Sequence, residues 1–148
     1  MTVYETGAAD RKNDITAIAI TKPYDRPEHL QGITYKIKTP NAAGQIINIY
    51  LTVNEHDGEP FEVFLNCTDS SINELASVSM VLISRLLRLG VPLDVISEDL
   101  EQVHSAHTAH MAGKQWCPSL IARIGRVLKE HEAQRQKQFN LDNNDASA

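Results

Sequence analysis

Side chains that commonly bind zinc are concentrated between residues 104 and 117. His104, His107 and His110 follow one another at a spacing of three, and Cys117 comes seven residues after the last of them. Imidazole nitrogen and thiolate sulfur are the donors that zinc takes in tetrahedral protein sites. Cys67, at the end of a predicted strand, could reach the same corner of the fold. The candidate metal ligands are therefore His104, His107, His110, Cys117 and Cys67.

The same stretch also fits a purely structural connector. Gly113 and Pro118 flank Cys117, which favours a loop in which sequence spacing does not place the ligands. The alternative is a solvated connector, with a half-buried Cys117 at the start of the last helix. The sequence leaves both interpretations open.

Composition limits the classes of protein. The chain has 148 residues, 42% hydrophobic and 22% charged, which is typical of one globular domain. Its net charge of −5 argues against direct nucleic-acid binding, which needs a concentrated positive surface. No apolar run reaches the roughly 20 residues of a membrane span, and the polar N-terminus lacks the apolar part of a signal peptide. We therefore expect a cytoplasmic protein with reduced cysteines.

The pattern along the chain predicts three parts. Residues 1–14 are expected to be flexible, residues 15–132 to form a single domain, and residues 133–148 to be a disordered tail, because the apolar helical face is lost after about residue 130. Residues 15–23 predict either a fourth strand or an arm that docks on a partner. Ile15, Ile18 and Ile20 are therefore candidate partner-binding residues.

Alternating apolar and polar residues predict strands over residues 32–40, 45–55 and 60–67. The second and third strands flank Asp57-Gly58, a strong signal for a tight hairpin turn. The three strands should form an antiparallel meander. Such a sheet has an apolar face that amphipathic helices must cover.

Helical spacing predicts the cover. Ser71 and Glu74 resemble a capping box at the start of the first helix, Pro92 opens a second helix, and Pro118 opens a third. The stripe predicted to face the core in the first helix contains Leu75, Val78, Leu82, Arg85 and Leu89, widened by Ile72, Ala76, Ile83, Leu86 and Leu87. The expected fold class is α+β: an antiparallel three- to four-stranded meander packed on two or three helices.

Arg85 and Arg88 are three residues apart on that first helix. They could bind a phosphate or a protein partner, although a solvated helix flank is the commoner outcome. The chain contains no Gly-rich phosphate loop, nucleophile elbow or Ser-His-Asp set, so we expect no catalysis.

Four segments resemble the TSCPD-type domain, which occurs near the C-terminus of adenosylcobalamin-dependent (class II) ribonucleotide reductases and in small stand-alone proteins. They are GITYKIKTP (32–40), YLTVNEHDGEPFEVFLN (50–66), LISRLLRLGVPLDVISEDLEQV (82–103) and WCPSLIARIGRVLKE (116–130). The hairpin segment, 52–64, is the most distinctive match.

The departures from the family pattern limit what the resemblance implies. Cys117-Pro118 is kept, but Ser119 replaces the acid that follows, and the histidines stand where family members often carry a cysteine. There is no Cys-x-x-Cys, and 148 residues cannot contain the reductase barrel. The resemblance therefore implies a detached accessory module that binds a protein, such as an enzyme of nucleotide metabolism or one acting on nucleic acid. We expect a homodimer, because three strands leave open edges. The alternatives are a zinc-binding accessory protein and a nucleotide-sensing domain or small enzyme.

Overall fold

The computed structural model describes residues 25–147. The chain divides into two units, residues 1–30 and 31–148. The described part of the first unit, residues 25–30, contains neither helix nor strand. Ile15, Ile18 and Ile20 lie outside the described residues. The second unit contains, in order, β1 (Gln31–Pro40), β2 (Ile46–His56), β3 (Glu59–Cys67), α2 (Ser70–Arg88), α3 (Leu93–Glu101), β4 (His110–Ala112), β5 (Gln115–Cys117) and α4 (Leu120–Ala146).

The first three strands form the predicted antiparallel meander, in the order β1-β2-β3. Asp57 and Gly58 both have positive φ, 52° and 76°, as the tight turn between β2 and β3 requires. Ile49 pairs with Ile37 on one side and with Cys67 on the other, so that the apolar residues of all three strands share a face.

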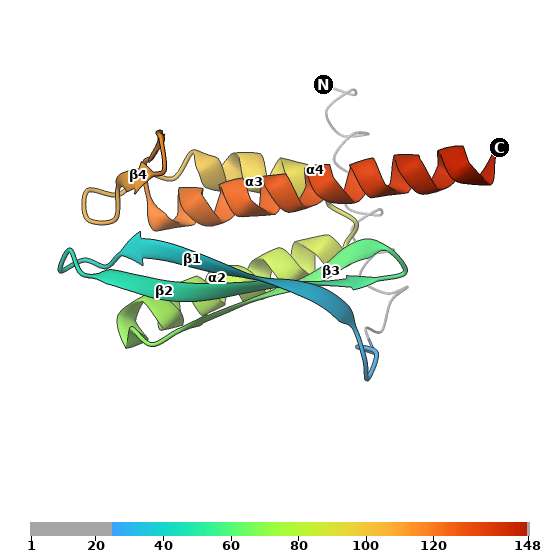
Figure 1. The fold of residues 1–148 in the computed structure, drawn as a ribbon. Coiled ribbons are helices and arrows are strands. Elements are labelled where there is room, and N and C mark those ends of the chain that lie inside the picture. The colour runs from blue at the N-terminus through green and yellow to red at the C-terminus, as the bar shows by residue number, and fades with distance from the viewer. Residues whose placement is uncertain (1–24, 148) are drawn as a thin grey trace, which may run out of the picture. The chain divides into compact units, whose positions relative to one another are not determined.

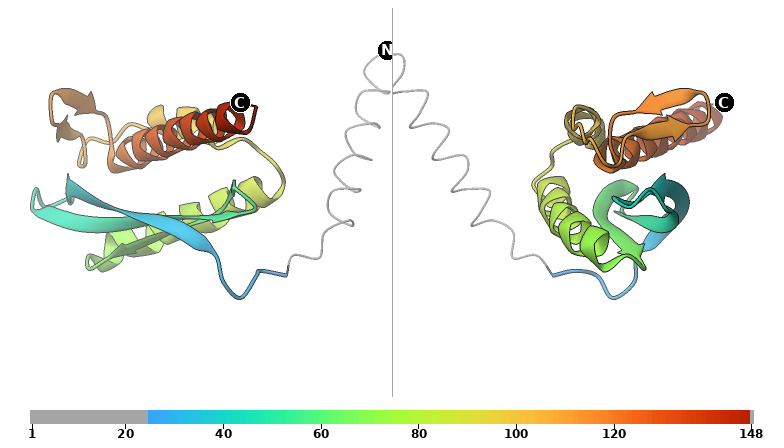
Figure 2. Two further views of the ribbon diagram at one scale, coloured as in Figure 1. Left: turned by 45° about the vertical axis from the view of Figure 1, so that its right-hand side comes forward. Right: turned by 90° about the vertical axis from the view of Figure 1, so that its left-hand side faces the viewer.

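This apolar face carries the core. Figures 1 and 2 show α3 and α4 side by side, with α4 over one face of the sheet. The strand residues of the buried cluster are Ile37, Ile49, Leu51, Val53, Val63 and Leu65, and the helices add Leu93, Ile96, Ile124, Val127 and Leu128 among others. The opposite sheet face carries exposed Lys36, Lys38, Tyr50 and Phe64. Three helices and an antiparallel meander within residues 25–147 confirm the predicted α+β class.

Helix α2 lies along the outer edge of β3 (Figure 2). The hydroxyl of Ser84 accepts a hydrogen bond from the amide of Val63 at 3.0 Å and donates to the carbonyl of the same residue at 3.2 Å. One turn from the start of α2, Asn73 Oδ1 accepts from the amide of Cys67 at 3.2 Å. These side chains satisfy backbone groups that an edge strand otherwise leaves unpaired.

The cap of α2 differs from the predicted one. Asp69, two residues before Ser71, is the N-cap, and its carboxylate accepts from the amides of Ser71 and Ile72. Ser71 Oγ donates to the same carboxylate at 2.7 Å. The hydroxyl of Ser71 and the carboxylate of Asp69 both suit a cap, and the longer helix is the one that Asp69 starts.

Helices α3 and α4 approach closely at Gly125. A Cβ at this position would lie 2.8 Å from Leu100 Cβ and 2.9 Å from the carbonyl oxygen of Ser97. The connector between the two helices was predicted to be a loop, and it contains a short hairpin, β4–β5, that the prediction missed. The hairpin turns through Gly113, whose φ is 62°.

Helix α4 continues to Ala146 instead of ending near residue 130. The sequence analysis treated residues 133–148 as a disordered tail, and the structure differs over 133–146. Arg135 holds this part of the helix to the β2–β3 turn by donating to the carbonyl of Gly58 at 2.9 Å. Polar pairs one turn apart, such as Gln138 with Asp142, support the helix without an apolar face.

Candidate functional site

The predicted metal ligands do not converge. His104 and His107 are exposed in the connector, whereas His110 and Cys117 face each other across the β4–β5 hairpin. Cys67 ends β3, where its sulfur accepts from the amide of Asp69 at 3.4 Å. Nowhere in residues 25–147 do three or more His, Cys, Asp or Glu side chains come close enough to hold a metal ion.

The environment of Cys117 also disfavours a cation. Its sulfur is fully buried and lies 2.9 Å from Arg126 Nη1, and the same guanidinium donates to the carbonyl of Trp116. A positive group beside the sulfur repels a metal ion. The facing His110 lies with Nδ1 2.8 Å from the carbonyl of Thr108; because a carbonyl only accepts, that nitrogen carries the proton. Cys117 is thus a buried structural residue in this fold.

Ser119, where the resemblance led us to expect an acid, is the N-cap of α4. Its hydroxyl accepts from the amide of Ala122 at 2.9 Å and donates to the carbonyl of Val103 at 2.6 Å. Serine and aspartate are both good N-caps, so the departure keeps the start of the helix. The donated bond also ties α4 to the end of α3.

The two arginines of α2 have different surroundings. Arg88 lies 3.3 Å from the fully buried carboxylate of Glu62, which also accepts from Asn54 at 2.9 Å. The Arg88 guanidinium sits 5.0 Å from the centre of the Phe61 ring. Arg85 is exposed. Arg88 therefore has a structural role in joining α2 to β3, and Arg85 is the arginine available to a partner.

A buried histidine joins α4 to the sheet. The ring of His131 lies with Nδ1 2.7 Å from the hydroxyl of Tyr35 and Nε2 3.0 Å from the carboxylate of Glu55. Burial raises the pKa of Tyr35, and the negative charges of Glu55 and Glu130 raise it further. The tyrosine thus keeps its proton and can donate to the imidazole, which fixes the helix over the sheet.

The next residue of α4 extends this polar contact. Burial alone would raise the pKa of Glu132, but hydrogen bonds from Arg135 and Gln136 lower it below its ordinary value. Arg135 approaches Glu132 at 2.7 Å and Glu59 at 3.4 Å.

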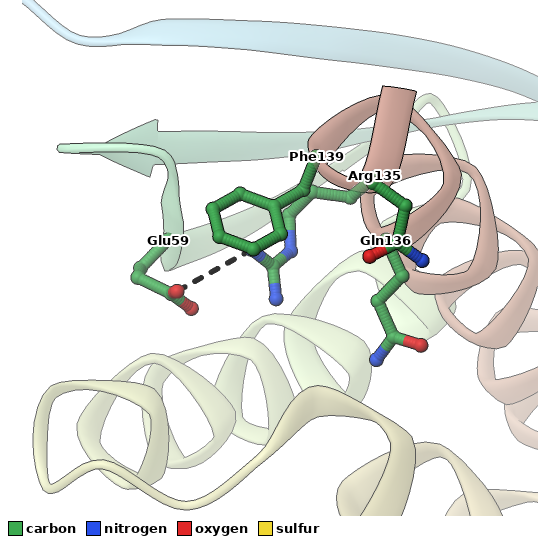
Figure 3. Close-up of a pocket in the computed structure, with 5 residues that line it drawn as sticks. Glu59, Arg135, Gln136 and Phe139 are labelled. Atoms are coloured by element: carbon green, nitrogen blue, oxygen red, sulfur yellow. Dashed lines mark hydrogen bonds and ion pairs between the residues drawn. The ribbon is translucent and has the colours of Figure 1, made fainter. Parts of the chain in front are cut away.

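Arg135 also lines an open pocket together with Glu59, Gln136, Phe139 and Asn140 (Figure 3). The pocket lies between the β2–β3 turn and the outer half of α4. Because the guanidinium donates to Glu132, Gly58 and Glu59, its charge is already balanced by protein acceptors. The pocket therefore has little to offer an anionic ligand such as a nucleotide.

The largest unexplained feature is on α2. Of the stripe that was predicted to be buried, Ala76, Ile83 and Leu87 are buried and Ile72 is partly buried, but the other large apolar residues are exposed and the prediction was wrong for them. Together with Val81 these exposed residues form what we call the α2 stripe; with their exposed fractions they are Leu75 (75%), Val78 (58%), Val81 (68%), Leu82 (60%), Leu86 (40%) and Leu89 (46%).

The reason is the way α2 packs. The buried face consists of Ala76, Met80, Ile83, Ser84 and Leu87. Ser84 must face the backbone of Val63 to satisfy the edge of β3, and this contact fixes the rotation of the helix about its axis. The stripe then points away from the core. The sequence did contain a signal for an exposed apolar face: α2 is apolar on two faces, and a helix needs only one apolar face to pack against a sheet.

Within residues 25–147, no helix combines the length and the apolar character that crossing a bilayer requires.

Comparison with known proteins gives one result. No curated protein and no solved structure matches the chain. Residues 13–132, more than half of the chain, match the sequence profile of the family described as TSCPD domain. The match covers the meander, α2, α3 and the first part of α4. The chain therefore belongs to the TSCPD domain family.

Proposed function

We propose that this chain is a non-catalytic accessory module of the TSCPD family that acts by binding a protein through the α2 stripe. The observation that carries the proposal is the exposure of six large apolar side chains along one helix. Monomeric proteins rarely expose large contiguous apolar patches, and where such a patch occurs it usually marks an interaction site.

The stripe has the properties of a preformed binding surface. Ser84 and Asn73 fasten α2 to β3 from the opposite side of the helix. Arg88 adds a contact with buried Glu62 near the C-terminal end. A surface held in this way loses little conformational entropy when a partner binds.

The family and the cysteines indicate the kind of partner and the cellular compartment that we propose. Because TSCPD domains resemble a part of ribonucleotide reductases, the partner we propose is an enzyme of nucleotide metabolism or one that acts on nucleic acid. Cys67 and Cys117 are free thiols, which fits a reducing compartment such as the cytosol. A net charge of −5 favours contact with protein over direct contact with nucleic acid.

We also propose a homodimer, on different grounds from those of the sequence. Open sheet edges were the original reason, but α2 now covers the edge of β3 and leaves β1 as the open edge of the described sheet. We place the dimer contact at the α2 stripe instead, because its large apolar side chains are exposed.

The alternatives have less support. Zinc binding would need donors that converge, and His104, His107, His110, Cys117 and Cys67 do not. A nucleotide sensor or small enzyme would need a pocket with uncommitted polar groups, and the pocket beside Arg135 lacks them.

Two matched variants test the proposal. Leu82→Ser changes the centre of the stripe, and Leu141→Ser makes the same change on α4; the two leucines are 60% and 59% exposed. Each full-length variant is used to capture proteins from the host lysate, and circular dichroism confirms that both are folded. We expect a protein that the wild type and Leu141→Ser retain and that Leu82→Ser loses. Identical capture by the two variants would contradict the proposal.

A further inference from the structure

We infer that a second copy of this chain occupies the α2 stripe, with the two α2 helices antiparallel and crossing at Leu82. This inference rests on the proposed function: the second copy covers the same surface, so pairing of two copies and binding of the enzyme exclude each other. Three observations support it: the symmetry of the stripe, its charges and its area.

The stripe has the same spacing in both directions along the helix. Counted from Leu82, the other residues facing the same way are Val78 and Leu86, four before and four after, and Leu75 and Leu89, seven before and seven after. A twofold-symmetric interface must be complementary to itself, so that residue i meets residue j and j meets i. Turning one helix end over end about Leu82 places leucine on leucine at the ends and valine on leucine between them.

The charges on the flank of the stripe select the antiparallel arrangement. Glu74 and Arg85 are eleven residues apart, about three helical turns, so they lie on the same side of α2. Glu74 is at the N-terminal end and Arg85 toward the C-terminal end, and both are exposed. Antiparallel pairing brings Glu74 of each copy toward Arg85 of the other. Parallel pairing would carry this flank of the second copy to the other side of the interface, so that Glu74 and Arg85 would not meet.

The area is sufficient for a dimer. Val81 lies about 100° round the helix from Leu82, so the five other stripe residues face the second copy, and their exposed fractions correspond to roughly 500 Å² on each copy. Two copies would bury about 1,000 Å² from the stripes alone, which is about the smallest area expected of a specific interface.

The first test measures the dimer of the purified full-length chain by sedimentation velocity over a range of concentrations. We expect the wild type and Leu141→Ser to be dimers. Leu82→Ser should raise the dimer dissociation constant by at least about a hundredfold, because two leucines are lost per dimer. A wild-type chain that stays monomeric up to a concentration on the order of 0.5 mM would overturn the inference. So would a dimer that Leu82→Ser leaves intact.

The second test determines the direction of the helices. Leu75→Cys and Leu89→Cys proteins, of which one carries a size tag, are mixed and oxidised, with the wild type as the control for Cys67 and Cys117. Antiparallel helices predict the mixed disulfide between positions 75 and 89 as the main product. A predominance of disulfides between identical positions would overturn the antiparallel arrangement.

A charge exchange gives an independent check. Glu74→Arg should weaken the dimer, and the double variant Glu74→Arg/Arg85→Glu should restore most of the affinity, since it exchanges the two charges that face each other. No recovery in the double variant would count against the predicted contact.

The outcomes separate this inference from the proposed function. A monomeric chain that still captures a lysate protein through Leu82 would overturn the pairing of α2 helices and leave the proposed function standing. A chain that neither dimerises nor captures a protein through Leu82 would overturn both.

Discussion

Ser84 provides a direct test of the contact that turns the α2 stripe outward. The side chain is 7% exposed, and its hydroxyl bonds both the amide and the carbonyl of Val63. Ser84→Ala removes both partners and leaves two backbone groups buried without a hydrogen bond. Helix α2 itself covers this edge of β3, so water cannot replace the hydroxyl without local opening.

The magnitude follows from the groups involved. A buried donor or acceptor left unsatisfied costs about 1–3 kcal/mol, with the amide the more costly of the two. Alanine returns about 0.5 kcal/mol through its better helix propensity. The net loss in the free energy of unfolding should be about 2 kcal/mol, which lowers the urea midpoint by about 1 M for a domain of this size.

The assay is urea unfolding followed by circular dichroism at one fixed protein concentration, because the proposed dimer would make apparent stability depend on concentration. Ser79→Ala is the matched control. Ser79 lies on the same helix and makes only an exposed bond to the carbonyl of Leu75. We expect the control to change stability by less than about 0.5 kcal/mol. If Ser84→Ala is as mild as Ser79→Ala, the edge contact does not fix the orientation of α2.

Two further predictions concern α4. Gly125→Ala should destabilise the chain by about 1 kcal/mol, because the new methyl group meets Leu100 and the Ser97 carbonyl and this overpacking exceeds the gain in helix propensity. Ala133→Gly, at an exposed position of the same helix, is the control that measures the helix propensity alone. A Gly125→Ala variant that is more stable than the wild type would contradict the close approach of α3 and α4. Hydrogen bonds lower the pKa of Glu132 from its ordinary 4.5 against the effect of burial, so its contribution to stability is present above pH 4.5 and is lost as the pH falls through the lower folded value. Glu132→Gln should therefore be less stable than the wild type in urea at pH 7, and the difference should shrink below pH 4.5; a difference that stays constant with pH would contradict this assignment.

The strands were predictable because their signals are local. Alternation along residues 32–40 and 60–67 identifies the buried face, and Asp57-Gly58 fixes the register of the hairpin, since few residues tolerate the positive φ of this turn. The family resemblance depends on the same segments, and the profile match over residues 13–132 confirms it. Local signals failed at the β4–β5 hairpin, whose strands are too short to show a period.

The candidate sites depended on distances that sequence spacing does not contain. His104, His107, His110 and Cys117 are close in sequence, but the hairpin separates their side chains and Arg126 takes the sulfur of Cys117. The contact between Tyr35, His131 and Glu55 joins three elements that lie far apart in the chain. No spacing rule could have found it.

The sequence by itself determined the three long strands, the approximate positions of the three helices and the family of this protein. Dihedral preferences, capping and apolar periodicity act over a few residues, so the local amino-acid sequence indicates where a strand or helix forms. Only the tertiary structure decided which face of α2 is buried, because α2 has apolar residues on more than one face. The face that carries Ser84 is buried, because the unpaired backbone of β3 needs the hydroxyl of this residue. The face that carries Leu82 is therefore exposed, and it is the surface to which we propose that a partner binds.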